Sequence, residues 1–288
     1  MSLVEVLAPG PLTLLEDAGR PGHMAVGVGR AGAADQDSYR LGGRLLGNRP
    51  GLAALEVTLG GLHVRAQGDL TVCLTGAPAP GSLDGRPVPH AAPFTFRDGQ
   101  ELRLGMPPTG LRTYLSVRGG LAVHAVLGSR SSDTMSGLGP AAVAAGDRLT
   151  VGEAVESFPN VDVAPVPPPG SGTVELAVLP GPRRDWFARP EALGESCWVV
   201  SGRSDRKGIR FEGEPVERHT DWAEAELPSE GMVRGAIQVP PGGQPVLFLN
   251  DHPVTGGYPV IGVVRSADID RAAQLRPGQQ VRFRWENR

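Results

Sequence analysis

A ten-residue segment near the C-terminus, NDHPVTGGYP (250–259), concentrates side chains that could do chemistry. An aspartate, a histidine, a hydroxyl and a tyrosine surround two adjacent glycines, and an apolar run lies on either side. A carboxylate or an imidazole can accept a proton, and backbone N–H groups beside glycines can approach an anion closely. The segment is interpreted either as a plain turn or as a ligand-binding loop.

Several arginines lie in short polar segments that contain glycine, where a guanidinium group could hold a carboxylate or a phosphate at two points. The stretch SGRSDRKGIRFEG (201–213) places Arg206 beside Ser204 and Asp205, and Arg20 lies in a similar segment near the N-terminus. These residues are candidate anion ligands, with a solvated turn as the alternative.

The hexapeptide GVGRAG (27–32) matches the G-x-G-x-x-G pattern of dinucleotide-binding proteins. That fingerprint needs a strand–helix–strand unit in a parallel sheet, whereas short, hairpin-like strands follow the hexapeptide here. We therefore expect no Rossmann fold. A glycine-rich turn just before a helix could still hold an anion near Arg30, and a plain turn is the alternative.

The usual signatures of hydrolases and metal sites are missing from the sequence. The six histidines show no H-E-x-x-H or Cys/His spacing, so no metal site is expected, and no G-x-S-x-G elbow occurs. Lys207 is the only lysine, which excludes a Walker P-loop and leaves no other residue to carry biotin. The net charge of −3, without a block of like charge, is not that of a nucleic-acid binder.

Two cysteines, Cys73 and Cys197, lie in apolar, strand-like runs far apart in the sequence. We expect both to be buried free thiols in a reduced cytoplasm. The N-terminus lacks a basic-then-apolar signal, and no run reaches the ~18 apolar residues of a membrane span. The sequence therefore indicates a cytoplasmic protein without a membrane partner.

Short apolar runs punctuated by glycine and proline dominate the chain, which contains 41 glycines and 28 prolines. This pattern predicts many short strands and a mainly β fold. A hairpin is predicted at 94–105, around the turn dipeptide Asp98-Gly99. Further strands are predicted within 54–76 and at 112–117, 174–179, 197–200, 209–211, 236–239, 245–250, 259–264 and 280–285.

Two helices are predicted. Asp35 is suited to cap a helix at 36–47, and a second helix is expected at 267–275. Gly42 and Gly43 inside the first helix each cost roughly 1 kcal/mol relative to alanine, which predicts close packing of this helix against a neighbour.

The proline-rich segment 159–172 cannot hold a strand ladder or a helix and is interpreted as a linker. We expect an N-terminal β subdomain with one helix at 1–158 and a C-terminal β subdomain at 173–288. Alternatively, the first strand (3–9) could cross over and pair with the other half.

The two halves echo each other at 15–28 and 249–263. Each segment has a leucine, any residue and an aspartate, followed by a glycine five residues after the aspartate. Duplicated β units would explain this similarity, and chance is the alternative.

Together these loops resemble a known family, the allophanate hydrolase subunit 2-like (KipA-like) family. The resemblance spans nearly the whole chain and is carried by the stretches GVGRAGAADQDSYRLGGRLLGN, LGSRSS, SGRSDRKGIRFEG and FLNDHPVTGGYPVIGVV. The family includes the PxpC component of bacterial 5-oxoprolinase and part of the carboxyltransferase domain of urea carboxylase. It implies two cyclophilin-like β-barrel subdomains with a few short helices.

For the oxoprolinase members, the resemblance implies an ATP-dependent complex that opens 5-oxo-L-proline to L-glutamate. The implied partners are a subunit 1-like protein (PxpB/KipI) and a third subunit (PxpA), with ATP bound with or on the partner and this chain inactive alone. One alternative is a biotin-dependent carboxyltransferase component whose biotin is supplied in trans. The other is a non-enzymatic, KipA-like regulator that binds a KipI-like inhibitor of a histidine kinase.

The resemblance also implies which residues face the ligand. Carried over by position, these are Asp17, Arg20, Asp35, Arg206, Asp251, Thr255, Gly256, Gly257 and Tyr258. We hypothesise that Arg206 binds the anion and that Asp17 or Asp251 positions or accepts a proton, and these three residues form the catalytic set. The remaining six, together with Arg30, Ser204 and Asp205, form the substrate-binding set.

The chain departs from the family pattern at two places. His252-Pro253-Val254 stands where an Arg-Gln-Thr run is usual, and Gly43 stands where asparagine is common. Pro253 has no N–H and Val254 has no hydroxyl to donate. A changed substrate or reduced activity is therefore an open alternative.

Overall fold

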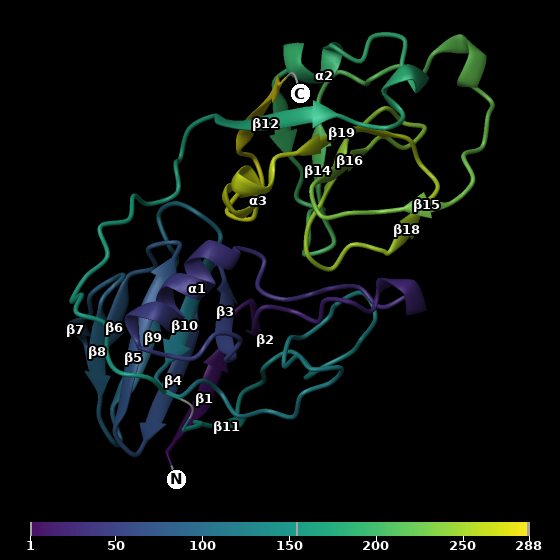
Figure 1. The fold of residues 1–288 in the computed structure, drawn as a ribbon. Helices are drawn as coiled ribbons and strands as arrows, with labels where there is room; N and C mark the ends of the chain where they lie inside the picture. Colours follow the sequence, from purple (N-terminus) through teal and green to yellow (C-terminus); the bar gives the residue numbers. More distant parts are fainter. Residues whose placement is uncertain (1, 154, 287–288) are drawn as a thin grey trace. The chain divides into compact units, whose positions relative to one another are not determined.

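The computed structural model describes residues 2–153 and 155–286. It divides into two compact units (Figure 1). The first contains the chain up to Arg20, Ala31–Asp133 and Gly137–Pro169, and the second contains Pro21–Arg30, Thr134–Ser136 and the chain from Gly170 onward. The division is therefore not contiguous, because two short segments of the N-terminal half group with the second unit.

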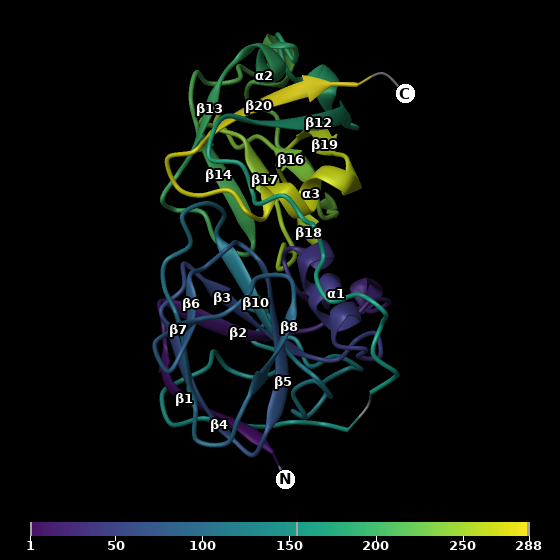
Figure 2. The ribbon, with the colours of Figure 1, turned by 90° about the vertical axis from the view of Figure 1, so that its left-hand side faces the viewer.

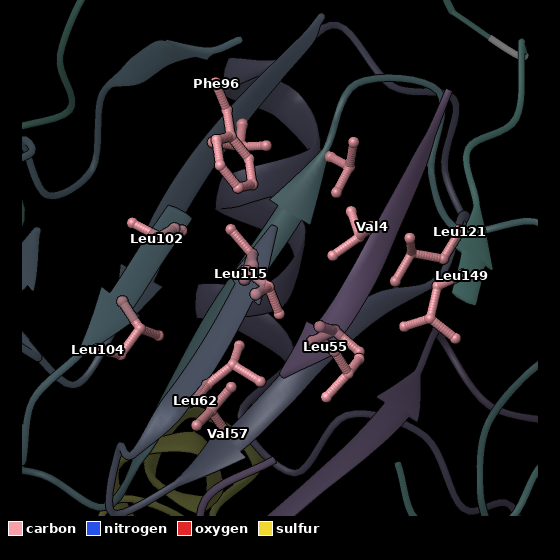
Figure 3. Packing of buried hydrophobic residues seen from close by; sticks show 14 of the residues in the cluster. Val4, Leu55, Val57, Leu62, Phe96, Leu102, Leu104, Leu115, Leu121 and Leu149 are labelled. Carbon is pink, nitrogen blue, oxygen red and sulfur yellow. The ribbon is translucent and has the colours of Figure 1, made fainter. Parts of the chain in front are cut away.

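The first unit is a pair of antiparallel sheets around one hydrophobic core. The strand orders are β11-β1-β4-β9-β6-β7 and β2-β3-β10-β5-β8. The strands are β1 Leu3–Pro9, β2 Leu12–Glu16, β3 Ala54–Thr58, β4 Leu62–Gln67, β5 Leu70–Gly76, β6 Gly81–Leu83, β7 Arg86–Pro87, β8 Pro93–Phe96, β9 Glu101–Leu104, β10 Arg112–Val117 and β11 Arg148–Thr150. Side chains of both sheets, such as Val4, Leu55, Leu102 and Leu115, meet in one buried cluster (Figure 3).

This arrangement confirms the mainly β prediction and refines it. In the first unit β11 and β7 remain at the edges of one sheet, and β2 and β8 remain at the edges of the other, so the strands form two open sheets. The resemblance implied a barrel at this place. Strand β1 pairs with β4 and β11 inside the same unit, so the crossover alternative for the first strand is wrong.

Helix α1 (Gln36–Leu45) packs against β5 and β10 of the second of these sheets (Figure 1). Strand β10 is buried along its whole length, because Leu115 faces the core while Tyr114 and Ser116 face the helix side. The predicted N-cap is confirmed, since the Asp35 carboxylate accepts a hydrogen bond from Ser38 N at 2.9 Å.

The segment 94–105 is not the predicted hairpin. The turn does form, with a φ of +76° at Gly99, but β8 pairs with β5 whereas β9 pairs with β4 and β6. The dipeptide Asp98-Gly99 specifies a reversal of the chain. The burial of the flanking side chains determines which sheet each of the two strands joins. Phe96 and Leu102 are both fully buried in the shared core, so the chain crosses from one sheet to the other between them.

The second unit is a closed barrel in the strand order β12-β19-β16-β17-β14-β13-β20 (Figure 2). Strands β12 and β20 pair in parallel and close the ring. The barrel strands are β12 Val174–Pro180, β13 Trp198–Val200, β14 Gly208–Glu212, β16 Ala236–Gln238, β17 Val246–Phe248, β19 Val260–Val264 and β20 Gln280–Trp285. Its core includes Trp198 and an edge-to-face pair, Phe211 and Phe283, whose ring centroids lie 5.2 Å apart. The barrel implied for the C-terminal half is thus confirmed.

Short elements complete the second unit. They are the paired strands β15 Glu230–Gly231 and β18 Thr255–Gly256, the helices α2 Ala192–Glu195 and α3 Ser266–Ala272, and the 3-10 turns Met24–Val26, Arg184–Trp186 and Thr220–Trp222. Helix α3 lies within the predicted 267–275 segment apart from its first residue. Within the described part of the chain, no helix has the length and apolar character needed to cross a membrane.

The proline-rich segment 159–172 holds neither a helix nor a strand. Its N-terminal part lies on the first unit: Ala164 N donates to Ala91 O at 2.9 Å, and the Ala164 side chain packs beside Leu45 and Cys73. Both cysteines are free thiols, as expected. Cys73 is buried, but the expectation of burial is wrong for Cys197, which is exposed just before β13.

Candidate functional site

Asp17 lies at the end of β2 and holds a serine-rich loop in place within the first unit. Its Oδ1 accepts hydrogen bonds from Gly19 N, Ser129 Oγ and Ser131 Oγ at 2.6–2.8 Å, and its Oδ2 accepts one from Arg130 N at 2.6 Å. The residue is only 3% exposed. A carboxylate offers about four acceptor positions, and four donors already approach this one.

Arg20, three residues after Asp17 in the sequence, is also buried in the first unit. Its Nη2 donates to Ser131 O, and its Nη1 lies 3.7 Å from Asp133 Oδ2. The side chain is fully enclosed. Arg20 thus links the segment after β2 to the loop at 129–133, and its guanidinium group is engaged with the protein itself.

Asp35 belongs to a buried polar network beneath α1. The Tyr114 hydroxyl accepts a hydrogen bond from Asp35 N at 2.9 Å and donates to Glu56 Oε2 at 2.7 Å. Arg112 Nε lies 3.3 Å from the other oxygen of Glu56. Burial raises the pKa of Tyr114 well above its ordinary value, so the phenol stays protonated and remains a donor to Glu56.

Arg206 and Asp251 form a buried ion pair in the second unit. Arg206 Nε donates to Asp251 Oδ2 at 3.0 Å, and Nη2 donates to Oδ1 at 3.2 Å. Thr134 adds two donors to Oδ2, its backbone N at 3.0 Å and its Oγ1 at 2.7 Å. Both charged side chains are at most 2% exposed. This pair is a two-point guanidinium–carboxylate contact of the strong class.

Ser204 and Asp205 shape the turn that delivers Arg206 to this pair. Asp205 Oδ1 accepts hydrogen bonds from Lys207 N at 2.8 Å and from Gly208 N at 3.1 Å. Ser204 Oγ accepts one from Arg210 N at 3.0 Å. An aspartate that bonds to backbone N–H groups two and three residues on is a typical turn former, so these side chains organise the loop before β14.

The loop at 252–258 is anchored at its start and open at its end. His252 is buried, stacks on Phe248 with ring centroids 5.8 Å apart, and contacts Pro253 O through Nδ1 at 2.8 Å. Thr255, Gly257 and Tyr258 are exposed, and Tyr258 is 42% accessible. The departure from the family pattern at 252–254 thus lies at the anchored part of the loop.

The short strand pair β15–β18, which includes part of this loop, is fixed by an ion pair. Gly256 in β18 lies opposite Glu230 in β15. Arg183 Nε donates to Glu230 Oε1 at 3.0 Å. That hydrogen bond lowers the pKa of the Glu230 carboxyl. Strand β18 is therefore held by its tethered partner β15, and the exposed Thr255, Gly257 and Tyr258 remain accessible to a ligand.

The two buried arginines among the predicted residues are engaged with the protein itself. Arg20 donates to Ser131 O and Arg206 donates to both oxygens of Asp251. Neither buried guanidinium group is therefore directed at a phosphate, and no step through ATP follows from these residues.

The comparisons with known proteins decide the family. The model of the carboxyltransferase domain, subdomain A and B, matches residues 26–285. This chain belongs to the carboxyltransferase-domain family. It is 35% identical to the C subunit of 5-oxoprolinase from Escherichia coli (strain K12) over 98% of this chain and 90% of that protein.

Two solved structures have the same fold as this chain over nearly its whole length. The structure of TTHA0988 matches this carboxyltransferase domain with a TM-score of 0.89 and 32% identity, covering 99% of this chain and 55% of that one. The Kluyveromyces lactis urea carboxylase matches with a TM-score of 0.89 and 29% identity, covering 98% of this chain and 27% of that one. This chain thus spans just over half of TTHA0988 and about a quarter of the urea carboxylase.

In this carboxyltransferase domain, the residues predicted from sequence fall into two groups. Asp17, Arg20 and Asp35 lie in the first unit, and Asp17 and Arg20 both bond to Ser131. The second unit contains Arg30, Ser204, Asp205, Arg206, Asp251, Thr255, Gly256, Gly257 and Tyr258. In this unit Arg206 and Asp251 bond directly to each other, and Arg30 is exposed.

Sequence reasoning missed the donors that hold the two aspartates. These are Ser129, Arg130 N and Ser131 for Asp17, and Thr134 for Asp251. The signal was available in the run LGSRSSDT (127–134), where small hydroxyl side chains cluster after a glycine. Glu56 was also missed, although a glutamate inside an apolar strand indicates a buried partner.

Proposed function

We propose that this chain is a subunit of an ATP-dependent 5-oxoprolinase that hydrolyses 5-oxo-L-proline to L-glutamate. The observation that carries the proposal is the extent of the match to the Escherichia coli relative, which takes in 98% of this chain and 90% of that protein. A relative named as a subunit and matched almost end to end supports the same role for this chain.

The reaction explains why such an enzyme needs several parts. Hydrolysis breaks the C–N bond of a stable lactam and adds water, which leaves a carboxylate and an amine. Phosphorylation by ATP would turn the lactam carbonyl into a better electrophile, and donors from the protein would stabilise the charge that develops on it. We assign ATP to the partner proteins, and substrate binding to this chain.

The geometry suggests different roles for the buried and the exposed candidates. Asp17 and Asp251 each accept four hydrogen bonds from the protein. We assign both, with Arg206, to positioning of the loops rather than to proton transfer. Arg30, Thr255, Gly257 and Tyr258 are exposed, and we assign substrate contact to them.

The partners in this proposal are a PxpB/KipI-like protein and a PxpA-like third subunit. The word subunit in the names of the relatives supports an assembly of several chains. Alone, this chain would bind the substrate but would not turn it over.

A reconstituted complex tests the proposal. The chain, its PxpB-like partner and the PxpA-like subunit would be combined, and glutamate release from 5-oxo-L-proline would be measured with and without ATP. We expect release only with ATP and all three proteins. Absence of glutamate from the full mixture would refute the proposal.

A carboxyl-transfer function is the second candidate, because the urea carboxylase of Kluyveromyces lactis has the same fold over 98% of this chain. Biotin would then have to come from another protein, since Lys207 is the only lysine here and follows an arginine in a tight turn. Incubation of the chain with a carboxylated biotin carrier and urea separates the candidates. Urea-dependent loss of the carboxyl group from the carrier would favour this second function.

A further inference from the structure

A cavity of about 190 Å³ lies beside α1, within the first unit. Its wall is made largely of small aliphatic groups and backbone, including Ala18, Leu52, Ala53 and Ala54. None of the predicted site residues lines it. For scale, an apolar cavity of about 150 Å³ in a protein core holds a benzene molecule, so this one has room for a single ring with a small substituent.

Three arginines line the same cavity. Arg40 and Arg44 are four residues apart on α1 and so lie on one face of the helix, and Arg49 follows the helix end. All three are exposed, so the cavity opens to solvent where they lie. Among the described residues, no carboxylate forms an ion pair with any of the three, unlike Arg112 and Arg206.

A buried hydroxyl also lines the cavity. Ser116 is 2% exposed, and its Oγ has no hydrogen-bond partner within the described part of the chain. The Oγ atom itself is inaccessible to solvent and packs against Gly42, so it makes the wall locally polar without contacting a bound molecule. The Tyr39 hydroxyl, by contrast, is already occupied, since it donates to Leu52 O at 2.8 Å.

The adjacent glycines of α1 explain how the cavity arises. A Cβ on Gly42 would lie 2.5 Å from Ser116 Oγ, so this position is closed by packing against β10. A Cβ on Gly43 would meet nothing nearer than the Asn48 side chain at 3.9 Å. Gly43 lines the cavity, and its missing side chain leaves part of the space empty.

We propose that this cavity binds a small organic carboxylate with an apolar ring, about the size of benzoate. The ring would lie against the aliphatic wall beside Gly43, and the carboxylate would be held at the mouth by Arg40, Arg44 or Arg49. A guanidinium group without a protein partner is suited to a carboxylate, because it can donate two parallel hydrogen bonds. This site is independent of the oxoprolinase proposal and lies on other residues.

Calorimetric titration of the full chain with benzoate tests the site. We expect saturable binding with a dissociation constant on the order of 1 mM, the range of a ligand this small. Benzamide, which has the same ring without the charge, should bind about tenfold more weakly. The triple variant Arg40→Gln/Arg44→Gln/Arg49→Gln should bind benzoate about tenfold more weakly than the wild-type protein, while its affinity for benzamide should be unchanged.

Gly43 provides a matched pair of variants. Gly43→Leu should fill the cavity and lower benzoate affinity at least about tenfold, whereas the smaller Gly43→Ala should retain most of it. The thermal unfolding of both Gly43 variants would be recorded as a folding control. If Gly43→Leu does not fold, the arginine variant, whose changes lie on the surface, still tests the site. The proposal would be overturned if the wild-type protein did not bind benzoate or bound benzamide equally well. Undiminished benzoate binding by the arginine variant or by folded Gly43→Leu would also overturn it.

Discussion

The Arg206 guanidinium group donates to both carboxylate oxygens of Asp251, from Nε at 3.0 Å and from Nη2 at 3.2 Å. The two residues come from the segment before β14 and the segment after β17, and the pair ties these loops together inside the second unit. Because Thr134 fills further acceptor positions of Asp251, the pair acts as an anchor for the adjacent exposed loop.

Removal of Arg206 should leave a buried carboxylate without its cation. We expect Arg206→Ala to lower the free energy of unfolding by about 3–5 kcal/mol, the usual effect of breaking a buried pair. All four tryptophans of the chain lie beyond residue 170, so urea unfolding followed by tryptophan fluorescence reports on this unit. Arg210→Ala, at an exposed position on β14, is the matched control and should change stability by less than about 0.5 kcal/mol. Equal effects of the two variants would contradict the anchor role.

The hydroxyl of Tyr114 joins α1 to the buried Glu56. Tyr114→Phe removes a donor to Glu56 and an acceptor for Asp35 N, so we expect a loss of about 1–3 kcal/mol in unfolding free energy. Calorimetric unfolding would measure this loss, with Tyr258→Phe at an exposed position as the control. A Tyr114→Phe protein as stable as the control would show that the network contributes nothing to stability.

The two adjacent glycines of α1 should respond oppositely to the same substitution. Gly42→Ala would press a methyl group onto Ser116 and should destabilise the protein by about 1–3 kcal/mol. The methyl group of Gly43→Ala would make only an ordinary contact with the Asn48 side chain, at 3.9 Å, and the substitution should stabilise the helix by up to about 1 kcal/mol. Melting temperatures of the two variants would measure the difference. The packing account requires Gly42→Ala to melt at the lower temperature of the two.

The sequence could predict α1 because its signals are local. Asp35, the spacing of Leu41 and Leu45 and the glycine that follows describe the helix without reference to any distant residue. Close packing at Gly42 was also foreseen, whereas Gly43 turned out to line a cavity. The predicted hairpin at 94–105 was wrong for the opposite reason, because the partner of a strand depends on which core its neighbours fill.

The aspartates of the candidate site were recognisable, but their surroundings were not. The echo between 15–28 and 249–263 has a physical counterpart, since Asp17 and Asp251 both follow a strand and both accept from hydroxyl and backbone donors. Those donors come from 129–134, more than a hundred residues from either aspartate. The run of hydroxyl side chains at 129–134 is visible in the sequence, but no local pattern specifies which distant carboxylate it contacts.

A pH dependence is expected from the surface ion cluster on β4 and β9. Hydrogen bonds from Arg65 and then His63 lower the pKa of Glu101 from 4.5 to about 2. The folded protein therefore holds this carboxylate ionised where the unfolded chain would protonate it. The resulting stabilisation is complete above the unfolded pKa of 4.5 and is lost as the pH falls through about 2.

Melting temperatures measured across this pH window would check the effect. On acidification, the melting temperature of Glu101→Gln should fall less than that of the wild-type protein. The melting temperature of the control Glu214→Gln, at an exposed position, should fall as much as that of the wild-type protein. Parallel pH curves for wild type and Glu101→Gln would be inconsistent with a lowered pKa at this residue.

The central claim, that this chain supplies the substrate-binding part of a 5-oxoprolinase, is tested most directly by the rate of ATP-dependent glutamate release from 5-oxo-L-proline. The rate would be compared between the complete complex, the complex without this chain, and a complex carrying Tyr258→Ala, a change at an exposed position that leaves both buried aspartate anchors intact. We predict full activity in the first, none in the second, and a raised KM for 5-oxo-L-proline in the third. Undiminished glutamate release without this chain would contradict the account.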